Sequence, residues 1–144
     1  MRYLLHLVLL LIIFRIDVKG QENPETTSID TTSLRLSEEV FVIVDSMAMP
    51  VGGYDPFYMY IAMNLRYPEE AREKMVTGKV FVEFVVEKDG KILPENIKIL
   101  RSPHISLGEE ARRLMENASE WKPGKIKGVP VRSKRTLPLS FKLG

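Results

Sequence analysis

His104 is the residue best placed to do chemistry in this chain of 144 residues, because the other histidine lies in the first few residues. Ser102 and Ser106 flank it, and a serine beside a histidine is one half of a nucleophilic site. Such a site also needs an orienting carboxylate and donors for an oxyanion, and neighbours on one turn rarely supply them. We therefore expect no enzyme activity, and we interpret His104 as a surface turn residue.

Sites for metals and nucleotides are not indicated either. The chain has no cysteine, and no run of acidic residues has the spacing of a calcium loop. Gly52-Gly53 would suit a phosphate-binding loop, but Tyr54, Asp55 and Pro56 follow where that motif requires a lysine. We interpret the glycine pair as a tight turn and predict no cofactor and no metal.

One basic cluster could attract a partner. Its members are Lys122, Lys125, Lys127, Arg132, Lys134 and Arg135. They suit an acidic peptide, an anionic cell-wall polymer or lipid head groups, or they form only a solvated face. Residues 1–20 hold three of the 21 basic residues and one of the 19 acidic residues, so the remainder is neutral overall. This balance argues against nucleic acid as a partner, because phosphate binding needs an excess of Lys and Arg.

The first twenty residues have the organisation of a targeting segment. Arg2 gives a positive start, residues 3–14 form an apolar run, and Val18-Lys19-Gly20 suits cleavage before Gln21. We predict a cleaved secretory signal in residues 1–20. A short membrane anchor is the alternative, although a 12-residue helix spans only about 18 Å of a hydrocarbon core of about 30 Å. Residues 21–38 are polar and predict a disordered tether, and residues 39–144 predict the folded domain.

The stretch from Gly78 to Gly90 predicts the central strand of a sheet. Apolar side chains recur at every second position from Val80 to Val86. Asp89-Gly90 favours a turn with two positive-φ residues, so we expect a hairpin that returns through Ile92–Leu100.

Other elements follow from local signals. Residues 39–47 are rich in β-formers and predict a first strand. Asp55 suits a helix N-cap for residues 56–65, and Pro68 suits the start of a second helix. Ser106 and Glu109 form a capping box for a longer helix. Its apolar stripe is Leu107, Ala111, Leu114, Met115 and Ala118, and its expected solvated side is Glu109, Glu110, Arg112, Arg113 and Glu116.

The last predicted strand, Val131–Leu143, contains Pro138. Because proline cannot donate to a ladder, this strand is expected at a sheet edge or with that position facing outward. Lysines around an edge discourage indiscriminate pairing but leave the backbone usable by one chosen peptide. We expect one side of Arg132–Phe141 to be unpaired. The alternative is that the strand only closes the sheet and the lysines keep it soluble.

Several motifs occur in a characteristic order: Tyr67-Pro68-Glu69-Glu70-Ala71-Arg72, Gly78-Lys79-Val80, Phe84-Val85-Val86, Asp89-Gly90, Ile97-Lys98-Ile99-Leu100, Trp121-Lys122-Pro123-Gly124, Gly128-Val129-Pro130-Val131 and Leu137-Pro138-Leu139-Ser140-Phe141. In this order they resemble the C-terminal domain of the TonB family, over about residues 50–143. Met49-Pro50-Val51-Gly52-Gly53 is similar to the variant of this domain found in Bacteroidetes-type proteins.

The resemblance implies a two-layer α+β fold, in which the central hairpin and the last strand form a small antiparallel sheet and a long helix packs on one face. It also implies a function. TonB proteins couple the inner-membrane proton gradient, through partner motor proteins, to transport by outer-membrane receptors, and they add a receptor segment to a sheet edge. The partner-binding residues expected on this basis are Tyr67, Pro68, Trp121, Pro123, Gly124, Arg132, Lys134, Thr136, Pro138, Ser140 and Phe141.

Two departures change the expected function. A full TonB has an uncleaved membrane helix and a long proline-rich segment, whereas this chain has a short apolar run and a short tether. We therefore expect a periplasmic, TonB-like binding module rather than a complete energy transducer, or an inner-membrane protein facing the periplasm if the apolar run is retained. Its expected partner is an outer-membrane receptor segment or another periplasmic protein. The alternative is a module that binds cell-wall polymer or a like subunit (a homodimer) through the basic cluster.

Overall fold

The computed structural model describes residues 38–144, so the predictions for residues 1–20 and for nearly all of the tether 21–38 lie outside the described residues. In chain order the described elements are β1 (Val40–Phe41), β2 (Met49–Pro50), α3 (Tyr54–Asn64), α4 (Glu69–Glu73), β3 (Gly78–Val86), a 3-10 turn (Pro94–Asn96), β4 (Lys98–Arg101), α5 (Ile105–Glu116), β5 (Trp121–Lys122), β6 (Gly124–Ile126) and β7 (Val129–Phe141).

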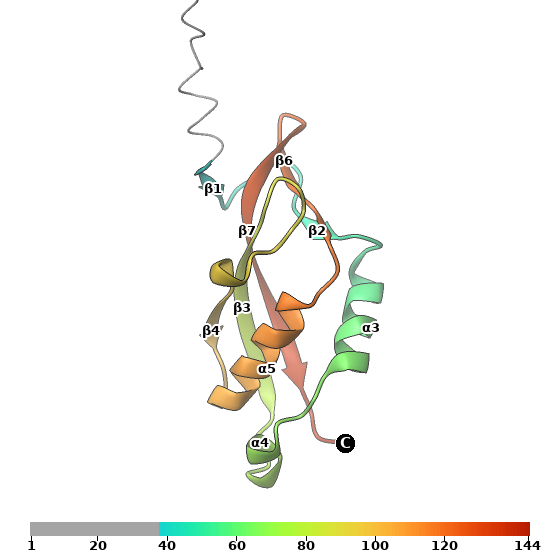
Figure 1. The fold of residues 1–144 in the computed structure, drawn as a ribbon, viewed down its shortest axis with the longest axis vertical. Coiled ribbons are helices and arrows are strands. Elements are labelled where there is room, and N and C mark those ends of the chain that lie inside the picture. Colours follow the sequence, from blue (N-terminus) through green and yellow to red (C-terminus); the bar gives the residue numbers. More distant parts are fainter. Residues whose placement is uncertain (1–37) are drawn as a thin grey trace, which may run out of the picture.

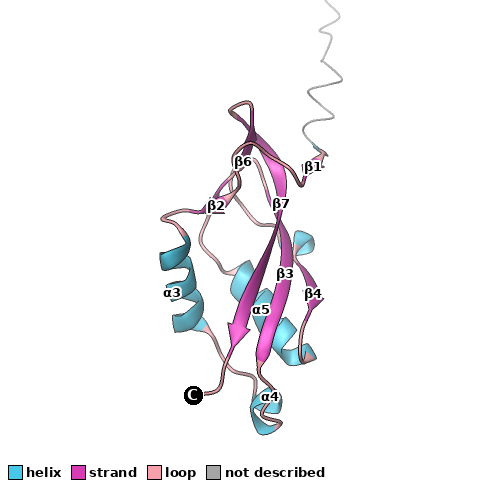
Figure 2. Cartoon of the chain, turned by 180° about the vertical axis from the view of Figure 1, so that it is seen from behind, coloured by secondary structure: helices cyan, strands magenta, loops and turns pink. Residues whose placement is uncertain are grey.

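The main sheet is built on β3 and β7, which pair antiparallel from Gly78 opposite Phe141 to Val86 opposite Ser133. Its strand order is β1-β7-β3-β4, β6 pairs with the start of β7, and β2 and β5 form a separate two-stranded sheet. Helix α5 lies across one face of the main sheet, and α3 stands beside β7 (Figures 1 and 2). The predicted two-layer α+β fold, with a central hairpin and a C-terminal strand under a long helix, is therefore confirmed.

The core follows from the alternation of β3. Val80, Val82, Phe84 and Val86 are fully buried, and they face the apolar stripe of α5. Burying one such side chain contributes about 1.5–3 kcal/mol, so this contact is the main source of the domain's stability. Four residues of the predicted helical stripe, Leu107, Ala111, Leu114 and Met115, are buried. The fifth, Ala118, lies beyond the end of α5 and is half-buried.

The hairpin differs from the expectation in its turn. β3 and β4 do pair antiparallel, but β4 begins at Lys98 rather than near Ile92, which makes only an isolated bridge with Val86. A 3-10 turn that starts at Pro94 separates the two, because proline cannot donate to a ladder. The prediction of two positive-φ residues at Asp89-Gly90 is wrong, since only Gly90 has a positive φ, of 85°.

The two-residue turn with positive φ at both positions occurs instead at Lys127-Gly128, between β6 and β7. Its φ angles are 50° and 78°, which match the turn type preferred by tight hairpins.

The starts of α3 and α5 and the length of the first strand also differ from the predictions. Helix α3 begins at Tyr54 behind Gly53, so Asp55 lies in the first turn instead of capping it. Helix α5 begins one residue before the predicted cap Ser106, because His104 caps it: the ring nitrogen Nδ1 accepts from the Ser106 N–H at 3.3 Å. The predicted strand 39–47 is reduced to β1, since Asp45 and Ser46 turn away and donate to the carbonyl of Lys125.

Candidate functional site

The C-terminal part of β7 has a strand on one side only. β3 pairs with residues 133–141, β6 with residues 129–131, and β1 with Arg132 and Ser133. Within residues 38–144, no strand pairs with the remaining side of residues 134–140. The expectation of an unpaired edge is therefore confirmed from Lys134 to Ser140 and wrong for Arg132 and Ser133, which β1 covers.

Pro138 fixes which backbone groups point outward. It lies opposite Phe81, and because it has no N–H, this pair is one that exchanges no hydrogen bonds. Pairs of the two kinds alternate along an antiparallel ladder, so Leu137 and Leu139 bond to β3 and the even-numbered residues face away from it. The outward groups are the N–H and C=O of Lys134, Thr136 and Ser140 and the C=O of Pro138.

Side chains along this edge separate into two faces. Leu137, Leu139 and Phe141 are buried on the helix side, whereas Thr136 and Pro138 are exposed on the other. This part of β7 therefore presents backbone groups and small side chains to solvent or to a partner. Thr136 and Pro138 do not form an apolar patch.

A groove separates this edge from α3. Its volume is about 510 Å³, and its lining on the helix side is Tyr58, Ile61, Ala62 and Leu65. On the strand side the lining is Lys79, Pro138, Leu139, Ser140 and Lys142. Figure 2 shows the same arrangement from behind, with α3 separated from β7 on the side away from β3. The open edge of β7 thus forms one wall of a groove whose other wall is a helix.

The basic cluster is partly neutralised. Arg132 Nε lies 2.7 Å from a carboxylate oxygen of Glu87, and Lys134 Nζ lies 3.2 Å from Glu83. Arg135 instead donates to the Tyr54 hydroxyl at 2.8 Å. Lys122, Lys125 and Lys127 are exposed. The exposed part of the basic cluster that has no such partner therefore consists of three lysines, not of all six basic residues.

Three of the predicted site residues have buried positions. Trp121 is 2% exposed, and its ring centroid lies 5.0 Å from that of Phe84 and 5.5 Å from that of Phe57. Gly124 and Phe141 are buried as well, whereas Pro123 is half-buried. Trp121 supports the site from inside the core. The side chain of Phe141 faces the core and its backbone groups face β3, so neither is directed toward the open edge.

Tyr67 and Pro68 lie at the other end of the molecule from Trp121. The Tyr67 hydroxyl donates to the Val76 carbonyl, and its ring packs edge-on against Phe141 at 6.1 Å between centroids. Pro68 is the residue before α4. Both fix the segment that leads into β3, and both are half-buried.

Sequence reasoning missed the role of Glu110, which it placed on the solvated side of the long helix. Glu110 is only 8% exposed and accepts from the Arg66 N–H at 2.7 Å and from the Arg113 guanidinium at 2.7 Å. Burial acts to raise the pKa of Glu110, but the hydrogen bonds from Arg113 and Arg66 outweigh it and hold the pKa below its ordinary value. The spacing of Glu110 and Arg113, three residues apart on a helix, was the signal for this pair.

The side chain of His104 is held by contacts with α5 and α4. Besides capping α5, its Nδ1 lies 2.8 Å from the Ser106 hydroxyl, and its Nε2 lies 3.5 Å from a carboxylate oxygen of Glu70 on α4. Since Nδ1 accepts from the helix, this nitrogen is engaged by the fold rather than presented to a substrate. The expectation of a surface turn residue is thus replaced by a half-buried cap.

Two further findings concern the part of the chain that the structure describes. No helix there combines the length and apolar character needed to cross a bilayer. No three histidine or acidic side chains in residues 38–144 are grouped so that they could hold a metal ion.

Comparisons with known proteins give one family. The family model described as Gram-negative bacterial TonB protein C-terminal matches residues 63–143. The NMR solution structure of the Helicobacter pylori TonB C-terminal domain is similar to this chain, with a TM-score of 0.48 and 20% identity, over 63% of this chain and 80% of that one. A comparison with curated proteins finds no match.

Proposed function

Since this chain belongs to the family of the Gram-negative bacterial TonB protein C-terminal domain, we propose that it is a periplasmic module that binds an extended segment of an outer-membrane receptor by strand addition. The observation that supports this proposal is the unpaired side of β7 from Lys134 to Ser140. A guest strand would lie in the groove between β7 and α3, where it could form hydrogen bonds with the outward N–H and C=O groups of β7.

The energetics favour a short guest. Each backbone hydrogen bond contributes about 0.5–1.5 kcal/mol net, and ordering an extended peptide opposes this gain. Burial of guest side chains against Tyr58 and Leu65 in the groove would supply the remaining binding free energy. Binding is therefore expected to be moderate and reversible, as suits a partner that must be released.

The cellular arrangement of the module follows from the N-terminal prediction. If residues 1–20 are retained as an anchor, the tether predicted for residues 21–38 holds the domain near the inner membrane, and inner-membrane motor proteins become expected partners. If they are cleaved, the module acts as a soluble periplasmic protein. N-terminal sequencing of the exported protein distinguishes the two: it starts at Gln21 in the second case.

A second candidate is binding of a cell-wall polymer or a like subunit through Lys122, Lys125 and Lys127. These exposed lysines form no ion pair within residues 38–144, and two of them line a groove of about 370 Å³. Replacing all three with glutamine should abolish cell-wall pull-down if this candidate is right and should leave binding of a receptor segment unchanged if the first is right.

Replacing Thr136 with proline tests strand addition. Because the Thr136 N–H faces away from β3, Thr136→Pro removes one donor for the guest and no hydrogen bond to β3. The matched control Thr136→Val keeps that N–H. We expect a receptor-derived peptide to shift the β7 amides in NMR spectra of the wild type and of Thr136→Val, with binding about tenfold weaker in Thr136→Pro. Shifts confined to α5 would contradict the proposal.

A further inference from the structure

The side of α3 that points away from the core is apolar and exposed. Pro56, Met59 and Met63 lie three and four residues apart, so they share one side of the helix. Met59 is 64% exposed, Met63 is 78% exposed, and Pro56 is exposed as well. Phe57 and Ile61 occupy the opposite, buried side. We call Pro56, Met59 and Met63 the outer face of α3, a helix that forms one flank of the domain in Figures 1 and 2.

The composition of α3 is unusual for a helix that has one side in solvent. Asp55 is its only charged residue. The exposed positions of α5, by contrast, include Glu109 and Glu116, as expected for a solvated helix face. Single apolar residues on a surface are ordinary, but exposed methionines one turn apart on a helix with so little charge indicate a contact surface. Most of α3 precedes residue 63, where the match to the TonB family begins, so the family does not account for this surface.

The outer face of α3 is distinct from the side that lines the groove to β7. The groove side carries Tyr58, Ile61, Ala62 and Leu65. Because consecutive residues of a helix are turned by about 100° from one another, these residues point away from Met59. A guest strand in the groove and a partner on the outer face would therefore contact different residues.

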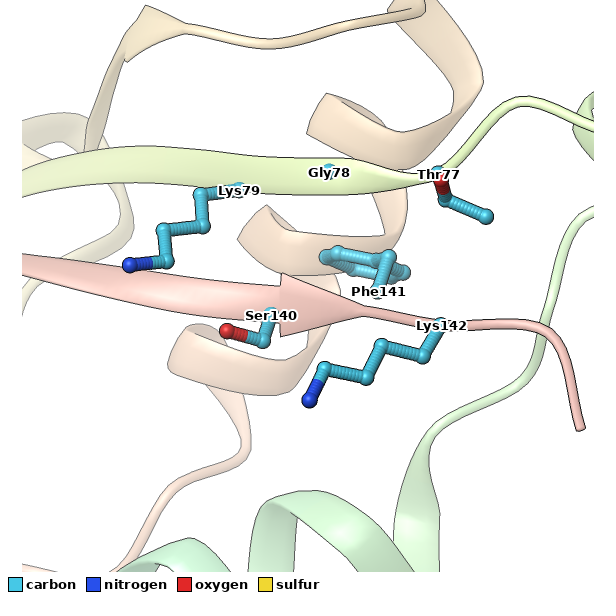
Figure 3. A pocket seen from close by; sticks show the side chains of 6 residues that line it. All are labelled: Thr77, Gly78, Lys79, Ser140, Phe141 and Lys142. Carbon is cyan, nitrogen blue, oxygen red and sulfur yellow. The ribbon is translucent and has the colours of Figure 1, made fainter.

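Charges at the two ends of α3 are of opposite sign. Asp55 lies in the first turn. At the other end Arg66 follows the helix, and Lys142 lines the groove together with Leu65. Figure 3 shows the side chain of Lys142 at the end of β7. Asp55, Arg66 and Lys142 form no ion pair within residues 38–144. Two α3 helices side by side and antiparallel would thus set the acidic end of each beside the basic end of the other.

We propose that the outer face of α3 binds the same face of a second copy of this chain, as an antiparallel pair of helices. Setting Met59 opposite Met63 of the second copy places Asp55 near Arg66 of that copy. The contact is then self-complementary, as a two-fold symmetric interface requires. Unbranched methionine side chains adapt readily to such a contact. The spacing of three and four residues along the outer face is that of helices which pack lengthwise.

The contact is expected to be weak, because it is small. α3 has 11 residues and is therefore about 16 Å long. A helix of this length cannot by itself bury the area of about 1,200–2,000 Å² that is typical of a stable interface. We expect a dissociation constant on the order of 10–100 µM, so that the chain is a monomer when dilute and a dimer when concentrated.

Sedimentation equilibrium of the full chain tests the proposal, over a range of about 5 to 500 µM that spans the expected dissociation constant. Met59→Lys with Met63→Lys places charge in the centre of the contact and should weaken association at least about tenfold. The matched control, Met75→Lys with Ile105→Lys, changes two residues that are each 73% exposed elsewhere, and it should associate as the wild type does. All four positions are exposed, so both variants should fold, which near-UV circular dichroism verifies.

Cysteine cross-linking tests the antiparallel orientation. Because the chain has no cysteine, Met59→Cys and Met63→Cys each introduce a single thiol. A mixture of the two variants should form disulfide-linked dimers more efficiently than either variant alone, since antiparallel pairing sets these two positions opposite each other. More efficient cross-linking within each variant than between them would indicate a parallel pair and would overturn the proposed geometry.

The location of the contact separates this inference from strand addition. Dilution of the wild type should shift the NMR amide signals of residues 55–63, and a peptide bound to β7 should leave the dimer intact. The inference is wrong if the lysine variant of α3 associates like the wild type, or if dilution shifts Lys134–Ser140 or Lys122–Lys127 instead. A chain that is monomeric at the highest concentration but binds a receptor-derived peptide would overturn this inference and leave the proposed function in place.

Discussion

Removing the carboxylate of Glu110 should destabilise the domain far more than removing that of its neighbour. Glu110 joins α5 to the segment between α3 and α4: one oxygen accepts from the Arg66 N–H, and both accept from Arg113, which also donates to the Asn64 carbonyl at 2.8 Å. Glu110→Ala leaves a backbone donor and a guanidinium without their acceptor. Glu109→Ala removes the same side chain from an exposed position on the same helix.

The size of the loss follows from burial. A hydrogen bond to a charged group contributes about 1.5–3 kcal/mol, and an exposed ion pair contributes less than about 1 kcal/mol. Glu110 is 8% exposed while the Arg113 side chain is 35% exposed, so the pair lies between these cases. We expect Glu110→Ala to cost about 2 kcal/mol, or about 10 °C in Tm for a domain of this size. Glu109→Ala should cost less than about 0.5 kcal/mol.

The assay is thermal unfolding followed by near-UV circular dichroism, to which the buried Trp121 contributes. The dependence on pH gives a second readout. Because the pKa of Glu110 is lowered in the folded state from the ordinary 4.5, its stabilisation is present above about pH 4.5 and is lost as the pH falls through the lowered value. The difference between wild type and Glu110→Ala should therefore shrink in strong acid. Equal losses for Glu110→Ala and Glu109→Ala at pH 7 would refute the reasoning.

Three other predictions concern the fold around the edge. Gly90→Ala should cost at least about 2 kcal/mol, because an added Cβ would lie 1.9 Å from the Trp121 carbonyl oxygen at a φ of 85°, and a chemical-denaturation midpoint unchanged from wild type would contradict this. His104→Ala should cost about 1 kcal/mol through loss of the helix cap, whereas His104→Asn, which keeps an acceptor, should recover most of it in the same denaturation assay. Pro138→Ala should leave stability within about 0.5 kcal/mol of wild type, because the restored N–H faces away from β3; a gain of about 1 kcal/mol would mean that it faces β3.

Long periodic patterns made the central elements predictable. The alternation from Val80 to Val86 and the helical stripe from Leu107 to Met115 each repeat over several turns or pleats, so local exceptions do not obscure them. Pro138 carried the most functional information, because a missing N–H restricts the pairing geometry directly. The central strand, the long helix and most of the open edge followed from these signals, whereas the two-layer arrangement was implied by the family resemblance.

Details decided by competing local interactions were not predictable. Ser106 with Glu109 is a sound capping box, but His104 reaches the same amide and extends the helix by one residue. Asp89-Gly90 and Lys127-Gly128 both lie in tight turns. The first is closed by hydrogen bonds from the Gly90 N–H to the Glu87 carbonyl and from the Glu87 N–H to the Lys91 carbonyl, and in it only the glycine has a positive φ, whereas both residues of the second do. The burial of Glu110 depends on the position of Arg66, which no pattern in the helix itself encodes.

Coverage of Arg132 and Ser133 by β1 was missed for a related reason. The predicted first strand was long and apolar, and nothing in it specified that only Val40–Phe41 would pair, in parallel, with β7. The bond from Arg132 to the Glu38 carbonyl at 2.6 Å is formed between segments far apart in the chain. Such pairing is set by the assembled sheet, so the end of the open edge could be located only from the structure.

Hydrogen exchange of the β7 amides, measured by NMR on the full chain, tests the open edge most directly. We predict slow exchange for Arg135, Leu137, Leu139 and Phe141, which bond to β3, and exchange about a hundredfold faster for Thr136 and Ser140. Addition of a bound peptide should slow the fast set alone. If Thr136 and Ser140 are already as protected as Leu137 in the free protein, the edge is occupied and strand addition at β7 is wrong.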